Sequence, residues 1–175
     1  MIEVIDNYLD ADDWARIYQK CLTAVPGEKG LEWGYSPTIA KNGDNASSTG
    51  YFIHIIKDDI ETSNHFDMIA PLVRRLDLDH YKTLYRSKVN MYPRTNKVEE
   101  HAYHYDLVDD DQKIIDHLNC VYYVNSNNGF TLFEDGSRIR SVENRMVIFS
   151  GKYAHSSTSC TDEPVRVSIN MNMVP

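Results

Sequence analysis

A series of short strand-like segments occupies the C-terminal half of the chain, from Lys82 onward. β-Branched and aromatic residues recur there in runs of a few residues, and turn-forming residues separate the runs. Asn127-Asn128-Gly129 and Asp135-Gly136 are two of these separators, and both are typical of hairpin turns. So many short strands in succession predict a β-sandwich, a jelly roll or a barrel.

The N-terminal part of the chain instead carries two amphipathic helical patterns. Asp10 is a predicted N-cap, and apolar residues follow it at helical spacing until Pro26-Gly27 ends the pattern. Ser63 is the predicted N-cap of a second helix, which Pro71 should kink or divide. Because both helices precede most of the strands, we expect them to pack on the outside of one sheet.

The rest of the N-terminal part is predicted to be strand and loop. Residues 1–9 and 51–56 have the pattern of strands, and residues 28–50 form a loop broken by a short strand near 32–35. A loop of this length is a candidate lid over a binding site. The predicted fold class is therefore α+β, mainly β. We expect one domain, 1–175, with a helical support region at about 1–80 and a metal-binding β core at about 82–173.

Composition and charge argue against several classes of function. The 175 residues are 42% hydrophobic, enough for one core, and the net charge of −8 argues against a nucleic-acid partner. The first ten residues lack the features of a signal peptide, and no apolar run is long enough to span a bilayer. The three cysteines are far apart, which favours reduced thiols. We therefore predict a cytoplasmic protein with no membrane partner, of undetermined oligomeric state.

A metal-binding pattern lies within HAYHYDLV, a predicted strand at residues 101–108. Side chains alternate faces along a strand, so His104 and Asp106 should project side by side, about 7 Å apart. An imidazole and a carboxylate are two of the three ligands in the 2-His-1-carboxylate set that binds non-haem Fe(II). The pair alone fits two surface polar residues equally well, so a third ligand is needed. His155, at the start of a later predicted strand, is the candidate.

The last predicted strand, VRVSIN, carries an arginine on its polar face. Arg166 shares that face with Ser168 and Asn170, while the valines and the isoleucine take the opposite face. An arginine that points into the interior of a β-fold is costly unless an anion meets it, and a carboxylate fits its two-pronged guanidinium. The alternative is a solvated arginine on an edge strand.

The order of these residues resembles the Fe(II)- and 2-oxoglutarate-dependent oxygenases, and within them the prolyl-4-hydroxylase-like branch with its small microbial and phage relatives. The resemblance covers half of the chain, from about Arg86 to Asn172. Its segments, in the family's order, are VNMYP, HYD, CVYYVN with NGFTLFEDG, NRMVIFSG with AHSS, and RVSIN.

This resemblance implies a fold and a set of site residues. The fold would be a double-stranded β-helix, or jelly roll, with iron at its open end. His104, Asp106 and His155 would be the catalytic metal ligands, and Arg166 would hold the distal carboxylate of 2-oxoglutarate. The further candidates for binding this co-substrate are Tyr123, whose hydroxyl would contact the same carboxylate, Tyr92, Ser168 and Asn90.

The resemblance also implies the reaction. An enzyme of this family uses Fe(II), 2-oxoglutarate and O₂, with ascorbate as a candidate reductant, and releases succinate and CO₂ as it hydroxylates an unactivated C–H bond. A prolyl residue in a peptide or a small amino-acid-like molecule is the expected substrate. Arg86 and Lys88 share a strand face with Asn90 and Tyr92, so a polar or acidic substrate group is one expectation, and ordinary surface charges are the other.

Two other classes of function remain open. An AlkB-like nucleic-acid demethylase would share the motif, but that branch has a second arginine six residues after the first, where this chain has Asn172. A cupin-like module that binds a metal and a small molecule without oxidising anything would keep the three ligands. Such a module has no need of Arg166 or Tyr123.

The remaining histidines are not expected to bind the metal. His54 lies in an apolar strand and is predicted to be a hydrogen-bonded core residue. His101 should face away from the ligands on its own strand, which leaves substrate contact or gating as its alternative role. His65, His80 and His117 are predicted to be solvated.

Overall fold

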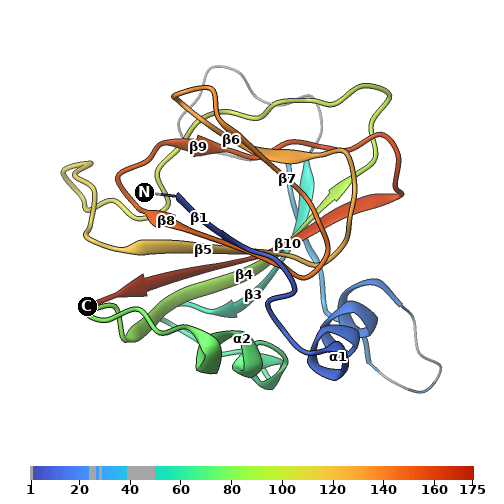
Figure 1. The fold of residues 1–175 in the computed structure, drawn as a ribbon, viewed down its shortest axis with the longest axis horizontal. Helices are drawn as coiled ribbons and strands as arrows, with labels where there is room; N and C mark the ends of the chain where they lie inside the picture. The colour runs from blue at the N-terminus through green and yellow to red at the C-terminus, as the bar shows by residue number, and fades with distance from the viewer. Residues whose placement is uncertain (1, 24–26, 28, 39–49) are drawn as a thin grey trace.

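Two antiparallel β-sheets face each other in the computed structural model, which describes residues 2–23, 27, 29–38 and 50–175 (Figure 1). The large sheet has the strand order β1 (Ile2–Ile5), β8 (Arg145–Ser150), β5 (Leu118–Tyr123), β10 (Val165–Val174), β4 (Thr83–Pro93), β3 (Tyr51–Lys57) and β2 (Gly34–Ser36). The small sheet has the order β7 (Arg138–Arg140), β6 (Phe130–Phe133) and β9 (His155–Ser156).

The chain alternates between the two sheets in its C-terminal half. It passes from β5 in the large sheet to β6 and β7 in the small one, returns to β8, crosses again to β9 and ends in β10. This alternation makes a jelly roll, so the predicted mainly-β α+β fold class is confirmed.

Two helices and one 3-10 turn cover the outer face of the large sheet (Figure 1). Helix α1 (Ala11–Leu22) begins as predicted, because the Asp10 carboxylate accepts a hydrogen bond from the Asp13 amide at 2.9 Å. The second helical pattern is divided into η1 (Phe66–Met68) and α2 (Ala70–Arg75), with the proline in the first turn of α2, where its missing N–H costs no hydrogen bond.

Ser63 does not cap this second helical region, contrary to expectation. Its hydroxyl accepts a hydrogen bond from the His65 amide at 3.1 Å, and η1 begins without a side-chain cap. Ser63 therefore stabilises the turn that precedes η1.

The main hydrophobic core lies between the helices and the large sheet. Strand β10 turns Val167, Ile169 and Met171 toward this core, where each is fully buried. Tyr122 of β5 is in the same core. The opposite face of these strands is therefore turned toward the small sheet.

Two predictions of local structure were wrong. Asn127–Gly129 is not a hairpin turn, because β5 and β6 belong to different sheets and this segment connects them. Residues 101–108 do not form a regular strand but pair through single bridges, among them His104 with His155. Asp135-Gly136, in contrast, does join the antiparallel pair β6 and β7, and Gly136 has the positive φ of +83° that such a turn favours.

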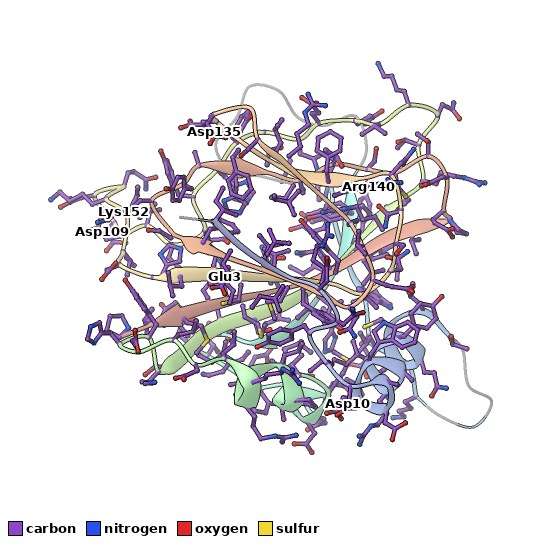
Figure 2. The ribbon with its side chains drawn as sticks, viewed as in Figure 1. Glu3, Asp10, Asp109, Asp135, Arg140 and Lys152 are labelled. Atoms are coloured by element: carbon purple, nitrogen blue, oxygen red, sulfur yellow. The ribbon has the colours of Figure 1, made fainter. Side chains whose placement is uncertain are left out.

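The predicted loop at 28–50 falls largely outside the described residues, since 39–49 are not among them; its short strand lies at Gly34–Ser36. Exposed charged side chains such as Asp109, Asp135 and Lys152 lie at the periphery of the molecule, away from the space between the sheets (Figure 2). Within the described residues, every helix is too short or too polar to cross a membrane.

Candidate metal centre and its pocket

His104, Asp106 and His155 converge between the two sheets. One ligand atom from each lies within 4.8 Å of the others, a separation that fits a single metal ion. The Asp106 carboxylate lies 3.9 Å from Nε2 of His104 and 3.6 Å from Nε2 of His155. The antiparallel bridge between the two histidines, with N–O distances of 2.9 and 3.1 Å, brings their side chains together although 50 residues separate them.

Both imidazoles are oriented to present Nε2 to a metal. Nδ1 of His104 lies 3.2 Å from the Ala102 carbonyl, and Nδ1 of His155 lies 3.3 Å from the Tyr153 carbonyl. A carbonyl can only accept, so Nδ1 carries the proton in each ring and Nε2 keeps its lone pair. These backbone contacts are the usual way in which a protein orients a metal-binding histidine.

His155 gives an independent test of whether a metal fits. Its Nε2 is buried and has no hydrogen-bond partner among the described residues, an arrangement that a metal ion would satisfy. Burial lowers the pKa of His155 to about 4, which keeps the ring neutral and able to bind a cation. The donor set of two neutral imidazoles and one carboxylate suits Fe(II).

Asp106 is held at both of its carboxylate oxygens. Nη2 of Arg86 donates to Oδ1 at 2.9 Å, and Nδ2 of Asn172 donates to Oδ2 at 3.2 Å. Asn172 is itself oriented by Arg86, whose Nε donates to it at 2.9 Å, and by Asn119 at 2.7 Å. Burial opposes ionisation of Asp106, but the positive charges near it, Arg86 first among the permanent ones, outweigh burial and lower the pKa of this carboxyl below its usual range.

The register of the sheet explains how this support is assembled. Asn172 of β10 lies opposite Arg86 of β4 on one side and Asn119 of β5 on the other, so the three side chains form one row across the sheet. The strand alternation that identified Arg166 extends to Asn172, and this was the signal in the sequence that could have predicted the row. The pairing of Arg86 with Asp106 has no such local signal.

A pocket opens beside the two histidines, and the empty space within it and at its open mouth amounts to about 410 Å³. It is lined by Tyr51, Lys88, Asn90, Tyr92, His104, Val121, Thr131, His155, Ser156, Ser157, Arg166, Ser168 and Asn170. Of the predicted site residues, His104, His155, Arg166, Tyr92, Ser168 and Asn90 therefore lie on one cavity.

Arg166 is the largest fully buried charged side chain of the pocket, with 1% of its surface exposed. Its Nε donates to Ser141 at 2.9 Å, and Nη1 lies 3.4 Å from the Thr158 carbonyl. No ion pair links it to a carboxylate of the described residues, so its charge is not compensated there. Strand β10 lies inside the sheet between β5 and β4, which rules out the alternative of a solvated edge arginine.

A glycine makes room for this arginine. A Cβ on Gly129 would come within 2.6 Å of Cδ of Arg166 and 2.7 Å of the Ser159 carbonyl. Gly129 was expected in a hairpin turn. The structure instead packs the Arg166 side chain directly against it, where any larger residue would clash.

Two tyrosines flank Arg166, with each ring centre 5.4 Å from its guanidinium carbon. Tyr92 stacks on Tyr51 at 5.4 Å, and burial raises the pKa of Tyr92 to about 12, so its hydroxyl stays protonated. The hydroxyl of Tyr123 is within hydrogen-bond distance of Oγ1 of Thr131 (2.7 Å) and of the Ile139 carbonyl (3.2 Å). Tyr123 itself does not line the pocket, whereas Thr131 does.

Ser168 and Asn90 lie opposite each other in the register of β10 and β4. Oδ1 of Asn90 is buried and has no hydrogen-bond partner among the described residues. These two side chains and Thr131 are among the polar side chains that line the pocket together with Arg166 and the histidines.

The other histidines lie outside the group of ligands. His101 donates to or accepts from Ser157 at 2.7 Å and packs 5.2 Å from Tyr92; the expectation that it faces away fails, because its segment is not a regular strand. His54 is hydrogen-bonded to the Glu32 carbonyl, as expected of a core histidine. His117 is only 1% exposed, so its prediction as a solvated residue was wrong.

The jelly roll with this site has the fold of the 2-oxoglutarate- and Fe(II)-dependent oxygenases. Solved structures of such enzymes are similar to this chain over nearly its whole length. No protein-family model and no curated protein matches the sequence.

Three of these structures define the similarity. A 2OG-Fe(II) oxygenase-family oxidoreductase from Burkholderia pseudomallei matches with a TM-score of 0.69 and 11% identity, over 98% of this chain and 84% of that one. A prolyl-4-hydroxylase from Pseudomonas putida matches with a TM-score of 0.65 and 16% identity, over 98% of this chain and 91% of that one. A prolyl hydroxylase from Trichoplax adhaerens was solved in complex with a hypoxia inducible factor peptide fragment. It matches with a TM-score of 0.67 and 17% identity, over 98% of this chain and 82% of that one.

Proposed function

We propose that this protein is an Fe(II)- and 2-oxoglutarate-dependent dioxygenase that hydroxylates an unactivated C–H bond and releases succinate and CO₂. The observation that carries the proposal is the position of Arg166. A buried, uncompensated guanidinium lies in the same pocket as two oriented imidazoles, so the pocket offers a metal site and an anion site together.

The proposed roles follow from the contacts of each residue. His104, Asp106 and His155 would hold Fe(II), which supplies the oxidising chemistry with O₂ when bound. Arg166 would pair with the distal carboxylate of 2-oxoglutarate, with Tyr92 as a protonated hydrogen-bond donor beside it.

The remaining polar residues would orient the co-substrate along the pocket. Ser168, Asn90 and Thr131 line the same pocket as the guanidinium and the histidines, and Tyr123 would act through its hydrogen bond to Thr131. Asp106 stays ionised because Arg86 and Asn172 hold both of its oxygens. The chain thus contributes binding, orientation and shielding from water, and ascorbate is the candidate reductant.

The same contacts weigh against the two other classes of function. A cupin-like binding module gains nothing from a buried Arg166, whose charge costs stability unless a ligand neutralises it. An AlkB-like demethylase would place an arginine where Asn172 contacts Asp106, and the net charge of −8 disfavours a nucleic-acid partner.

For the substrate, we propose a prolyl residue of a peptide or a small amino-acid-like molecule. The support is the likeness of the fold to prolyl hydroxylases, one of which was solved with a peptide fragment bound.

The test is an anaerobic titration of the protein with Fe(II) and 2-oxoglutarate, followed by exposure to O₂ and measurement of succinate. We expect 2-oxoglutarate to bind only when iron is present and succinate to form on oxygenation. Arg166→Ala should keep iron binding and lose 2-oxoglutarate binding, while Arg140→Ala, which removes an exposed arginine, should change neither. Wild-type succinate formation by Arg166→Ala would contradict the assignment of Arg166.

A further inference from the structure

Two cationic side chains of strand β4 point to the same face of the sheet but differ in their partners. Arg86 is paired with Asp106 and Asn172. Lys88, two residues along, lines the pocket, and its ammonium group makes no hydrogen bond or ion pair with any described residue. The contrast matters because a half-buried lysine normally finds a partner or extends into water.

Lys88 lies at the metal end of the pocket. It is opposite Asn170 in the register, next to the row of Arg86, Asn172 and Asn119 that holds Asp106. Arg166 lies opposite Tyr92, which is four residues from Lys88 on β4, so the two cations start about 13 Å apart along the strand. The two side chains therefore mark different ends of the cavity.

The charges of the loaded site do not balance without a further anion. With Fe(II) and 2-oxoglutarate bound as proposed above, the charges of the metal, Arg86, Lys88 and Arg166 exceed those of Asp106 and the dianionic co-substrate. The loaded site therefore carries an excess of two positive charges. Arg86 is paired with Asp106 and Arg166 would pair with the distal carboxylate, so Lys88 is the side-chain cation without a paired anion, and one substrate carboxylate would offset one of the two excess charges. Burial lowers the pKa of Lys88, and the negative charge of Asp106 only partly offsets this.

We infer that Lys88 is the counter-ion for a carboxylate of the substrate that is oxidised, and so selects acidic substrates. The inference rests on the proposed function and narrows it. The carboxylate belongs either to a free amino acid or to an acidic residue next to the reacting one in a peptide. Because Lys88 lies at the metal end of the pocket, a substrate carboxylate bound to it would bring a C–H bond close to that carboxylate toward the iron.

The test compares matched acidic and neutral probes. Protein loaded with Fe(II) and 2-oxoglutarate without O₂ is titrated with N-acetyl-L-proline and its primary amide, and with the blocked dipeptides acetyl-Pro-Glu-amide and acetyl-Pro-Gln-amide. Each dissociation constant is read from the change in visible absorption of the loaded complex. We expect the acidic member of at least one pair to bind about tenfold more tightly, as one charged hydrogen bond provides. Which pair shows the preference distinguishes a free acid from an acidic peptide.

Variants then connect the preference to Lys88. Lys88→Met and Lys88→Gln should remove it, and Lys88→Arg should retain it. Lys82→Met is the matched control, because it removes one positive charge from an exposed lysine that pairs with Asp77. Thermal unfolding of each variant verifies that it is folded.

Two outcomes would overturn the inference. One is a loaded wild-type protein that binds no acidic probe more tightly than its neutral match. The other is a Lys88→Met variant that keeps the preference but binds 2-oxoglutarate itself more weakly, which would assign Lys88 to the co-substrate. A wild-type protein that fails to bind 2-oxoglutarate with iron would refute the proposed function itself, and this is detected before any probe is added.

Discussion

Nη2 of Arg86 lies 2.9 Å from Oδ1 of Asp106, and this contact decides how the carboxylate faces the metal site. The opposite oxygen accepts from Asn172, so each oxygen has one lone-pair direction occupied by the protein and one left for a metal. The guanidinium and the amide therefore act through Asp106 rather than on a substrate, and Arg86 and Asn172 are positioning residues.

Replacement of Arg86 should therefore weaken metal binding without removing a ligand. We expect Arg86→Met to lower the affinity for Fe(II) or Mn(II) about 10- to 100-fold, the usual effect of losing a partner of a metal ligand. Anaerobic calorimetric titration measures this affinity. Arg140→Met, at an exposed position, is the control and should bind metal like the wild type. Equal affinities in Arg86→Met and the control would show that Asp106 needs no such support.

Stability of the metal-free protein should fall as the pH is lowered from about 6.5 toward 4. Burial lowers the pKa of His155 to about 4 and that of His101 to about 3, from an ordinary value of 6.5. Below 6.5 the unfolded chain therefore takes up protons at these two rings that the folded chain excludes, and each ring reduces the free energy of unfolding by about 1.4 kcal/mol per pH unit. Burial also lowers the pKa of His65, which adds to the same slope. Urea denaturation at a series of pH values measures the slope.

The matched variant for this pH dependence is His101→Asn. It removes the His101 ring but leaves His104, Asp106 and His155 in place. The slope of the unfolding free energy against pH should therefore decrease by the contribution of about one proton taken up on unfolding. A slope that is unchanged in His101→Asn would mean that His101 is already protonated in the folded protein at acidic pH.

Gly129→Ala should affect the anion end of the pocket more than the metal end. The added methyl group would lie 2.6 Å from Cδ of Arg166 and 2.7 Å from a backbone carbonyl, so the arginine side chain must move. We expect a loss of about 1–3 kcal/mol in stability and weaker 2-oxoglutarate binding, with iron affinity largely kept. Gly30→Ala is the control, since nothing lies within 4 Å of the added group there. Normal 2-oxoglutarate binding by Gly129→Ala would contradict the claim that Arg166 can keep its position only if residue 129 has no side chain.

Strand alternation explains which parts of this molecule could be predicted from sequence. It correctly placed Val167 and Ile169 in the core and Arg166 on the inner face, because β10 is long and regular. It failed for His101, because residues 101–108 follow single bridges rather than a strand.

The support of Asp106 could not be predicted in the same way. Its contact with Arg86 joins positions 20 residues apart through the register of different segments, and no local pattern determines that register. The connection between β5 and β6 was misread for a related reason. Asn-Asn-Gly favours a tight turn wherever it occurs, but whether the flanking strands then pair depends on the sheet that each of them joins.

Tyr123 and Thr131 should act as one unit in binding the co-substrate. The Tyr123 hydroxyl donates to Oγ1 of Thr131 at 2.7 Å, with the Ile139 carbonyl as a second, longer acceptor at 3.2 Å, so the Thr131 proton stays free to donate to the co-substrate. Tyr123→Phe would then leave the Thr131 hydroxyl without its partner, and Thr131→Val would remove the pocket-lining group itself. We expect each change to weaken 2-oxoglutarate binding by about 1 kcal/mol, roughly fivefold, and the double variant to be little worse than either. Dissociation constants from anaerobic titration of the four proteins complete the cycle. Fully additive losses would instead mean that Tyr123 contacts the carboxylate independently of Thr131.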